Sequence, residues 1–285
     1  FLYKQFLYLC FEMKKKEKFR LFHSFKRRFY FFVIRIFRFG TYLIYSHKSP
    51  KFLFILSPPY CGSTMLNQLI SSSNNVSCNN NLGTREGQLL PGVKHFMFQK
   101  DRWNPKVKYP WNKVKKVWMK YWDYSKPIFL DKSIPNIMRV DEIEKVFTPI
   151  KYICMVRNPY AQVEGIMRRN SQDAKSAAEF AIKCLKYQSK NKLRENCLFF
   201  TYEDLCENGE NVLKKMIHFV PELSDMNINL EFTSHNFKAN KKMKITNLNS
   251  EKISKISDKD LSIINTVFVS EKALLESFNY KIIER

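Results

Sequence analysis

The sequence predicts an α/β protein in which helices flank a central, mostly parallel sheet. Short apolar runs typical of buried strands occur at 52–56, 151–156 and 196–202, and stretches with apolar residues at helical spacing follow them. Strands that alternate with helices favour parallel pairing, because a helical crossover returns the chain to the same edge of the sheet. With 285 residues, 45% of them hydrophobic, the chain is long enough for a core of ordinary size.

Each of the first two strands leads through a tight loop into a helix. The run FLFIL is followed by the loop SPPYCGST (57–64) and by apolar residues at helical spacing from Met65 onward. The run KYICMV is followed by RNP and by a helix that ends at about Asn170, with Pro159 suited to its first turn. The stretch 99–126, rich in Trp, Tyr and Lys, predicts loop or short helices. Further helices are predicted over 173–193, 209–219 and 261–278.

Residues 1–50 form a basic and aromatic arm, and we treat residues 51–285 as one domain. The arm holds twelve Lys and Arg, two Asp and Glu and eleven of the 25 Phe, so it carries +10 of the net charge of +23. Arg35 and Arg38 interrupt its apolar stretches, which are too short to span a bilayer. One interpretation is an amphipathic basic helix on an anionic membrane or on RNA. The other, which we favour because aromatic stripes are usually core, is a helix whose Phe face packs on the domain.

The seven cysteines are scattered, with no CxxC pair and no zinc-ligand spacing. This pattern predicts reduced thiols in a cytoplasmic protein. Peripheral contact with a membrane, if the arm binds one, would be made through that arm. We expect no bound metal.

The loop after the first strand has the ingredients of an anion site. Free backbone N–H groups and the positive end of the following helix converge there, Gly62 lets the backbone approach an anion, and Ser63 and Thr64 add hydroxyl donors. The loop differs from the nucleotide-triphosphatase form GxxxxGK[ST], because Ser57 replaces the first Gly and no Lys precedes Ser63. A P-loop kinase is therefore a poor match.

Five segments stand in a distinctive order: PPYCGSTMLNQLIS (58–71), TREGQLLPG (84–92), FLDKSIPN (129–136), YICMVRNPYAQVEGIMRR (152–169) and FFTYEDL (199–205). This series resembles the sulfotransferase family that uses 3′-phosphoadenosine 5′-phosphosulfate (PAPS), in particular its branch of bacterial and protein-tyrosine sulfotransferases. The resemblance implies a P-loop-like three-layer sandwich. It also implies transfer of a sulfuryl group from PAPS to a hydroxyl or amine acceptor, without a metal.

The resemblance assigns the donor-binding residues. The 5′-phosphosulfate loop falls on Tyr60, Cys61, Gly62, Ser63, Thr64 and Met65, and the 3′-phosphate motif falls on Arg157 and Gly165. Two of these depart from the family pattern, since Tyr60 stands where the family has a basic residue and Gly165 where it has a Ser. The late loop with Lys238, Lys241 and Lys242 lies where the family often meets the 3′-phosphate.

The resemblance also assigns the catalytic residues. Glu86 matches the general base of the tyrosine branch, with His95 as the second candidate, and Lys132 matches the Lys that contacts the bridging and sulfonate oxygens. We expect Arg85 either to orient Glu86 or to substitute for the cation missing at Tyr60. The motif Tyr202, Glu203 and Asp204 is expected to be structural.

The partners implied are PAPS, its product PAP, and an acceptor that is a carbohydrate, a phenol or tyrosine, or a lipid. Two other functions stay open at this point. One is a catalytically degenerate member of the same fold, suggested by Tyr60 and Gly165. The other is a basic nucleic-acid-binding protein, suggested by the charge of +23 and by the stretch 99–126. We expect no nucleic acid as a partner, because no RNP, OB or helix-turn-helix signature is present.

Overall fold

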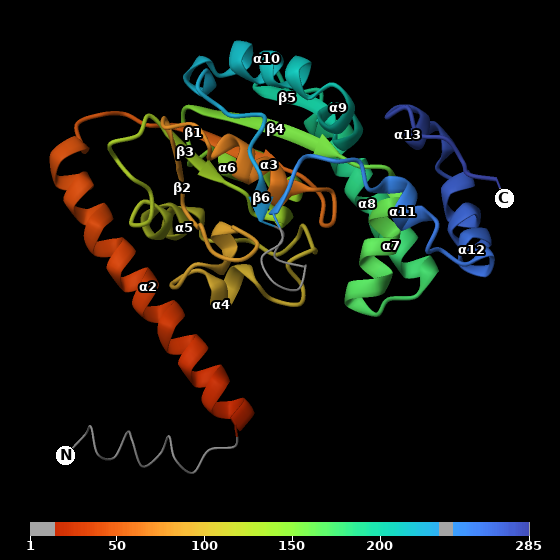
Figure 1. Cartoon of the computed structure of the whole chain (residues 1–285), viewed down its shortest axis with the longest axis horizontal. Coiled ribbons are helices and arrows are strands. Elements are labelled where there is room, and N and C mark those ends of the chain that lie inside the picture. Colours follow the sequence, from red (N-terminus) through yellow and green to blue (C-terminus); the bar gives the residue numbers. More distant parts are fainter. Residues whose placement is uncertain (1–14, 234–241, 285) are drawn as a thin grey trace.

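The computed structural model describes residues 15–233 and 242–284, and its centre is a five-stranded sheet (Figure 1). The strands lie in the order β2-β3-β1-β4-β5, and every neighbouring pair is parallel. The predicted α/β architecture is therefore confirmed. The strands are β1 (Lys51–Leu56), β2 (Val76–Cys78), β3 (Ile128–Asp131), β4 (Ile150–Val156) and β5 (Cys197–Thr201).

The two short strands β2 and β3 lie outside the three strands predicted from apolar runs. At three and four residues, they are too short to give a readable period. A separate antiparallel pair is formed by β6 (Phe232–Thr233) and β7 (Lys242–Met243).

The helices occupy both faces of the sheet and its carboxyl edge (Figure 1). The predicted helix over 261–278 is wrong in one respect: it is two helices, because Glu271 leaves helical geometry with φ −122° and ψ 26°. Phe268 and Leu275, on either side of the break, both face the core. The helices are α2 (Lys15–Tyr45), α3 (Ser63–Ile70), α4 (Lys94–Met97), α5 (Trp111–Trp118), α6 (Val140–Glu144), α7 (Pro159–Asn170), α8 (Ala174–Asn191), α9 (Tyr202–Glu207), α10 (Gly209–Phe219), α11 (Asn249–Ile253), α12 (Asp258–Val269) and α13 (Lys272–Glu276), with the 3-10 turns η1 (Gly87–Leu89), η2 (Ile134–Met138) and η3 (Pro221–Leu223).

Alternation along β1 separates two hydrophobic layers. Phe52 and Phe54 point to a face that is filled by aromatic residues from α5 and the segments around it. Leu53 and Ile55 point to the other face and pack with α3 and α10. A strand that is apolar on both faces is buried on both, which is why FLFIL reads as a continuous apolar run. The result is the expected three-layer arrangement.

The Trp-rich stretch 99–126 contributes to the core. It contains the short helix α5, as predicted, and Trp118 and Trp122 are fully buried. Trp118 Nε1 donates to the carbonyl oxygen of Gly87 at 3.1 Å, and Trp122 Nε1 donates to that of Leu130 at 3.0 Å. These rings therefore support the segments that carry Glu86 and Lys132, rather than a nucleic-acid surface.

The helix of the arm, α2, lies beside the domain along its carboxyl-terminal part and projects past it at its other end (Figure 1). Arg27 Nη2 donates to the carbonyl oxygen of Leu89 at 3.3 Å, the ring of Phe31 packs edge-on against Tyr121, and Arg38 pairs with Asp123. Among the described helices, none combines the length and the apolar character that crossing a membrane requires.

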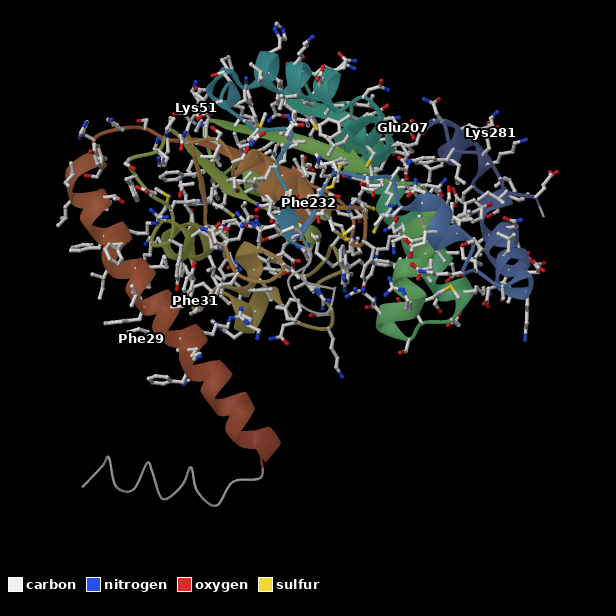
Figure 2. All side chains as sticks on the ribbon, viewed as in Figure 1. Phe29, Phe31, Lys51, Glu207, Phe232 and Lys281 are labelled. Atoms are coloured by element: carbon white, nitrogen blue, oxygen red, sulfur yellow. The ribbon has the colours of Figure 1, made fainter. Side chains whose placement is uncertain are left out.

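Among the α2 phenylalanines whose side chains are described, the expectation that the Phe face packs on the domain holds only for Phe31, which is 3% exposed. The other described phenylalanines of this helix are at least 59% exposed, and Figure 2 shows Phe29 and Phe31 on the same helix for comparison. The phenylalanines concerned are Phe25, Phe29, Phe32, Phe37 and Phe39.

The cysteines in the described residues are free thiols, as predicted, and Cys10 lies outside those residues. Four of the six are buried. Burial raises the pKa of the Cys61 and Cys184 thiols, so these side chains act as small neutral core residues.

The docking of α2 gives a matched prediction on two phenylalanines. Phe31→Ala should lower the free energy of unfolding by about 3 kcal/mol, because it removes a buried ring and leaves a cavity. Phe29→Ala should change it by less than about 0.5 kcal/mol, because that ring is exposed. Urea denaturation measures both, and equal effects would contradict the docking described here.

Candidate active site

The loop between β1 and α3 has the geometry of an anion-binding turn. Gly62 has φ +87° and is the N-cap of α3, so the first N–H groups of the helix are free of intrahelical partners. A Cβ atom at Gly62 would lie 2.9 Å from the ring of Tyr202, so only glycine fits there. Tyr60 also has a positive φ, of 65°. The loop thus presents backbone donors at the positive end of a helix.

Lys132 joins this loop to the residue predicted as the base. It follows β3 directly, and it is 2% exposed. Its Nζ lies 3.3 Å from Ser63 Oγ, from Thr64 Oγ1 and from Glu86 Oε1. The neighbouring parallel strands β1 and β3 end at the same edge of the sheet, which brings these residues together from three separate segments. The structure therefore brings Ser63, Thr64, Glu86 and Lys132, each assigned to the site from the sequence, to one place.

Glu86 is held in that place by a set of amides. The residue is 5% exposed, and its carboxylate accepts a hydrogen bond from Gln88 Nε2 as well as from Lys132. Asn80 Nδ2 donates to the Glu86 carbonyl oxygen at 2.8 Å. Neither Gln88 nor Asn80 was singled out from the sequence, where runs of Asn are typical of turns.

Asp131 ties the Glu86 segment to the end of β3. Its fully buried carboxylate accepts hydrogen bonds from the side chains of Asn79, Ser133 and Asn136 and from the N–H groups of Gly87 and Ser133, at 2.8–3.1 Å. Burial raises the pKa of Asp131 to about 6, and the hydrogen bonds from Asn79 and Ser133 oppose that rise. Asp131 acts on the site through its neighbours and is a positioning residue.

Arg157 stands at the end of β4 and is 4% exposed. Its Nε donates to Asn249 Oδ1 at 2.6 Å and its Nη1 to the Tyr60 carbonyl oxygen at 3.3 Å. The guanidinium lies 4.1 Å from the ring centre of Tyr202, a cation–π contact. Its Nη2 is buried and has no hydrogen-bond partner among the described residues. A buried cation with an unused donor is suited to binding an anion.

The two departures from the family pattern are packed against each other. A Cβ atom at Gly165 of α7 would lie 2.8 Å from Tyr60 Cβ, so the tyrosine occupies the space that a side chain at 165 would need. Tyr60 OH donates to Asn170 Oδ1 at 2.7 Å, which fixes the ring there. Burial raises the pKa of Tyr60, so its hydroxyl stays neutral. Tyr60 and Gly165 are 105 positions apart in the sequence but in contact in the fold, so the two departures from the family pattern form one local change.

Other predicted residues are placed differently. The side chain of Arg85 donates to Asn67 and Asn81 and has no described contact with Glu86, so the role of orienting Glu86 is not supported. Its role as a substitute cation for the loop stays a prediction. His95 is exposed on α4. The side chain of Met65 packs in the core, so only its backbone is left to contact a bound sulfuryl donor. Lys242 is exposed on β7, and Lys238 and Lys241 lie outside the described residues.

The TYEDL motif is structural, as expected. Thr201 and Asp204 form a capping box at the start of α9. Glu203 Oε1 accepts from the N–H of Asn158 at 2.9 Å, which fixes the turn after Arg157. Tyr202 has an additional place in the site, beneath the Arg157 guanidinium. No sequence signal distinguishes that ring from an ordinary core tyrosine.

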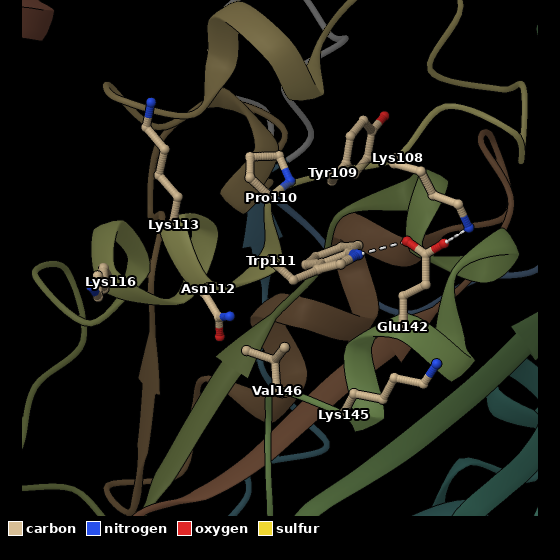
Figure 3. Close-up of a pocket in the computed structure, with 10 residues that line it drawn as sticks. All are labelled: Lys108, Tyr109, Pro110, Trp111, Asn112, Lys113, Lys116, Glu142, Lys145 and Val146. Carbon is tan, nitrogen blue, oxygen red and sulfur yellow. Dashed lines mark hydrogen bonds and ion pairs between the residues drawn. The ribbon is translucent and has the colours of Figure 1, made fainter.

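A separate hollow of about 770 Å³ opens on the surface between the 108–116 and 142–146 segments (Figure 3). Glu142 lies at its wall and accepts from Trp111 Nε1 at 2.9 Å and from Lys108 Nζ at 2.6 Å. None of the predicted site residues lines it. Within residues 15–233 and 242–284, no group of three metal-ligating side chains is found.

Comparison with known proteins assigns the class. The model of the sulfotransferase family matches residues 50–222, which is more than half of the chain. The chain therefore belongs to the sulfotransferase family.

Similar solved structures are also sulfotransferases. The sulfotransferase domain from the curacin biosynthetic pathway is 16% identical and has a TM-score of 0.49, with 83% of this chain and 100% of that chain covered. The sulfotransferase domain from the Synechococcus PCC 7002 olefin synthase is 19% identical, with a TM-score of 0.48 and coverages of 83% and 98%. Mouse sulfotransferase SULT7A1, complexed with PAP, is 12% identical, with a TM-score of 0.46 and coverages of 80% and 89%. No curated protein matches the chain.

The contact between Tyr60 and Gly165 gives a prediction. Gly165→Ser should lower the free energy of unfolding by about 1–3 kcal/mol, because its side chain overlaps Tyr60. In a Tyr60→Gly background the same substitution should be close to neutral, so urea denaturation of the double-mutant cycle should give a coupling of at least about 1 kcal/mol.

The matched control for that cycle is Gly40→Ser in α2, where a Cβ atom would meet nothing within 4 Å. It should be neutral or slightly stabilising, since Ser has the higher helix propensity. A Gly165→Ser protein as stable as the Gly40→Ser protein would show that Tyr60 does not restrict this position.

Proposed function

We propose that this sulfotransferase uses PAPS as its donor and transfers the sulfuryl group to a hydroxyl or amine acceptor. The observation that carries the proposal is the position of Lys132 Nζ, equidistant from Ser63 Oγ, Thr64 Oγ1 and Glu86 Oε1 at 3.3 Å. One buried cation thus contacts both the anion loop and a carboxylate able to accept a proton. Sulfuryl transfer from a phosphosulfate needs a base for the acceptor's proton and a group that stabilises the charge developing on the leaving oxygen, both at one place.

The donor would be held at both of its anionic ends. The backbone N–H groups after Gly62 and the hydroxyls of Ser63 and Thr64 would bind the phosphosulfate, at the positive end of α3. Arg157 would bind the 3′-phosphate through its unused Nη2. Tyr60 brings no positive charge to the loop, so Lys132 would be the main cation at the phosphosulfate.

The transfer is a substitution at sulfur. The acceptor oxygen or nitrogen forms a bond to sulfur while the bond from sulfur to the bridging oxygen breaks, and PAP leaves with that electron pair on its phosphate oxygen. Lys132 would stabilise the charge that develops on the bridging oxygen. Glu86 would take the acceptor's proton, so the products are the sulfated acceptor, PAP and protonated Glu86. As in phosphoryl transfer, positioning and charge stabilisation do most of the work.

The pairing of Glu86 with Lys132 suggests an order of events. Before the donor binds, the lysine neutralises the buried carboxylate at 3.3 Å. When donor oxygens take up Lys132 Nζ, the Glu86 carboxylate would be released from that ion pair and could accept a hydrogen bond from the acceptor's hydroxyl or amine. Donor binding would thus prepare the base.

A second candidate is a sulfotransferase fold that binds nucleotide but no longer catalyses transfer. The observation that favours it is the Tyr60 side chain, which lacks a charge and packs toward Gly165. The two candidates share donor binding and differ in turnover, so the next two experiments separate them.

The first experiment measures donor binding. Titration calorimetry with PAP and no added magnesium should show saturable binding. Arg157→Ala should weaken it by about 100-fold, because a charge-assisted contact is lost. Arg194→Ala is the control, since Arg194 precedes β5 and therefore lies at the opposite edge of the sheet, where it pairs with Asp141 and Glu144. Wild-type protein that takes up no PAP would exclude both candidates.

The second experiment measures turnover with labelled PAPS and a panel of phenols, carbohydrates and lipids. Glu86→Gln should retain PAP binding and lose activity by about 10²–10⁴-fold, because the amide cannot accept the proton. The control Glu179→Gln alters an exposed residue of α8 and should leave activity unchanged. An active Glu86→Gln enzyme would refute the base assignment, and PAP binding without turnover on the whole panel would favour the degenerate candidate.

A further inference from the structure

The face of α2 that points away from the domain is a stripe of large apolar side chains. Its members are between 56 and 64% exposed and recur at alternating spacings of four and three residues. At the angular step of an α-helix they fall within an arc of about 80°, opposite the side that docks through Arg27, Phe31 and Arg38. Figure 2 shows the side chains along this helix. The stripe consists of Phe25, Phe29, Phe32, Ile36, Phe39 and Leu43.

The charge around the stripe has one sign only. Arg28 and Arg35 are exposed on one flank of it. The sequence from residue 18 to residue 85 contains no Asp or Glu, so the helix supplies no carboxylate beside the stripe. The carboxylate that reaches α2 from the domain, Asp123, pairs with Arg38 on the docked side.

We propose that this outward stripe of α2 binds the surface of a bilayer containing anionic phospholipids, with the helix lying parallel to the membrane plane. Interfacial helices place such a stripe about 5–10 Å into the boundary between headgroups and acyl chains, with basic residues at the headgroups. The docked side stays on the domain along residues 27–41. The helix therefore lies between the domain and the membrane.

Charge favours lipid over a second copy of the chain. The alternating spacing is also that of a coiled-coil seam, and two copies joined through it would place Lys26, Arg28 and Arg35 beside the seam. With no acidic residue on the helix from residue 18 onward, these cations would face cations. Anionic headgroups supply the missing opposite charge. RNA would supply it too, but it would leave the aliphatic members Ile36 and Leu43 in water.

The test is co-sedimentation of the full chain with phosphatidylcholine vesicles, with and without phosphatidylserine. Binding should be strong with phosphatidylserine and fall as salt rises. The triple variant Phe29→Ser, Phe32→Ser, Ile36→Ser should bind about 100-fold or more weakly, because three exposed apolar side chains no longer enter the bilayer. Leu193→Ser with Val269→Ser is the control, since these exposed apolar residues lie off α2, and it should bind like wild type.

A variant with two fewer positive charges tests whether the basic residues beside the stripe bind anionic headgroups. Arg28→Gln with Arg35→Gln should weaken binding to phosphatidylserine vesicles by about 20-fold, and should hardly change binding to phosphatidylcholine alone. Both substitutions are at exposed positions. Should the triple variant fail to fold, hydrogen exchange of wild-type residues 25–44 reports the same contact, because vesicles should slow it.

Several outcomes would overturn the proposal. These are wild-type protein that leaves the vesicles unbound, a triple variant that binds as wild type does, and a chain that dimerises through the stripe and ignores vesicles. If the triple variant still binds an RNA oligomer and the wild-type protein binds no vesicles, the basic residues of α2 serve nucleic-acid binding instead. Because vesicle binding is measured without donor, its failure would leave the proposed sulfuryl transfer untouched.

Discussion

The carboxylate of Asp131 accepts five hydrogen bonds at the point where β3 ends. Its donors come from the end of β2, from η1 and from η2, so one side chain fixes three segments relative to the sheet. Lys132 follows it directly, and Glu86 precedes Gly87, whose N–H is one of the donors. The separation between the proposed cation and the proposed base therefore depends on a residue that contacts neither the anion loop nor a reacting atom. A buried acceptor with this many donors is strongly localised, because any displacement would leave several buried N–H groups unpaired.

The parallel sheet explains why the site assembles from distant segments. In the order β2-β3-β1-β4-β5 the carboxyl ends of β1, β3 and β4 are adjacent, and the anion loop, Lys132 and Arg157 follow these ends directly. This is the edge at which open α/β sheets bind their ligands. The sequence could place Ser63 and Arg157 together for this reason, since each follows a predicted strand, whereas Lys132 was assigned by the resemblance because β3 is too short to be recognised as an apolar run. Glu86 was located by the resemblance alone, and the structure brings it to the same edge.

Other parts of the site could not be predicted from the sequence, for physical reasons. Asn79 and Asn80 look like turn residues, and only the fold shows that their amides hold Asp131 and the Glu86 carbonyl. In the sequence, Tyr60 and Gly165 are two separate departures from the family pattern. A sequence does not show that two residues 105 positions apart are in contact. Large apolar side chains occur on more than one side of the arm helix, so periodicity alone could not tell that Phe31 lies on the docked side and the phenylalanines of the stripe on the outward side.

The hydrogen bond from Arg27 to the carbonyl of Leu89 also has a geometric consequence. Leu89 is three residues from Glu86, and the outward stripe lies on the far side of the same helix. An α-helix with its side chains is about 10–12 Å across. With the stripe in a bilayer, α2 would act as a spacer that holds the Glu86 segment roughly one helix diameter from the depth that the stripe reaches, and so close to the level of the headgroups. Acceptors would then be selected by the height at which their hydroxyl stands above the membrane, in addition to their chemistry.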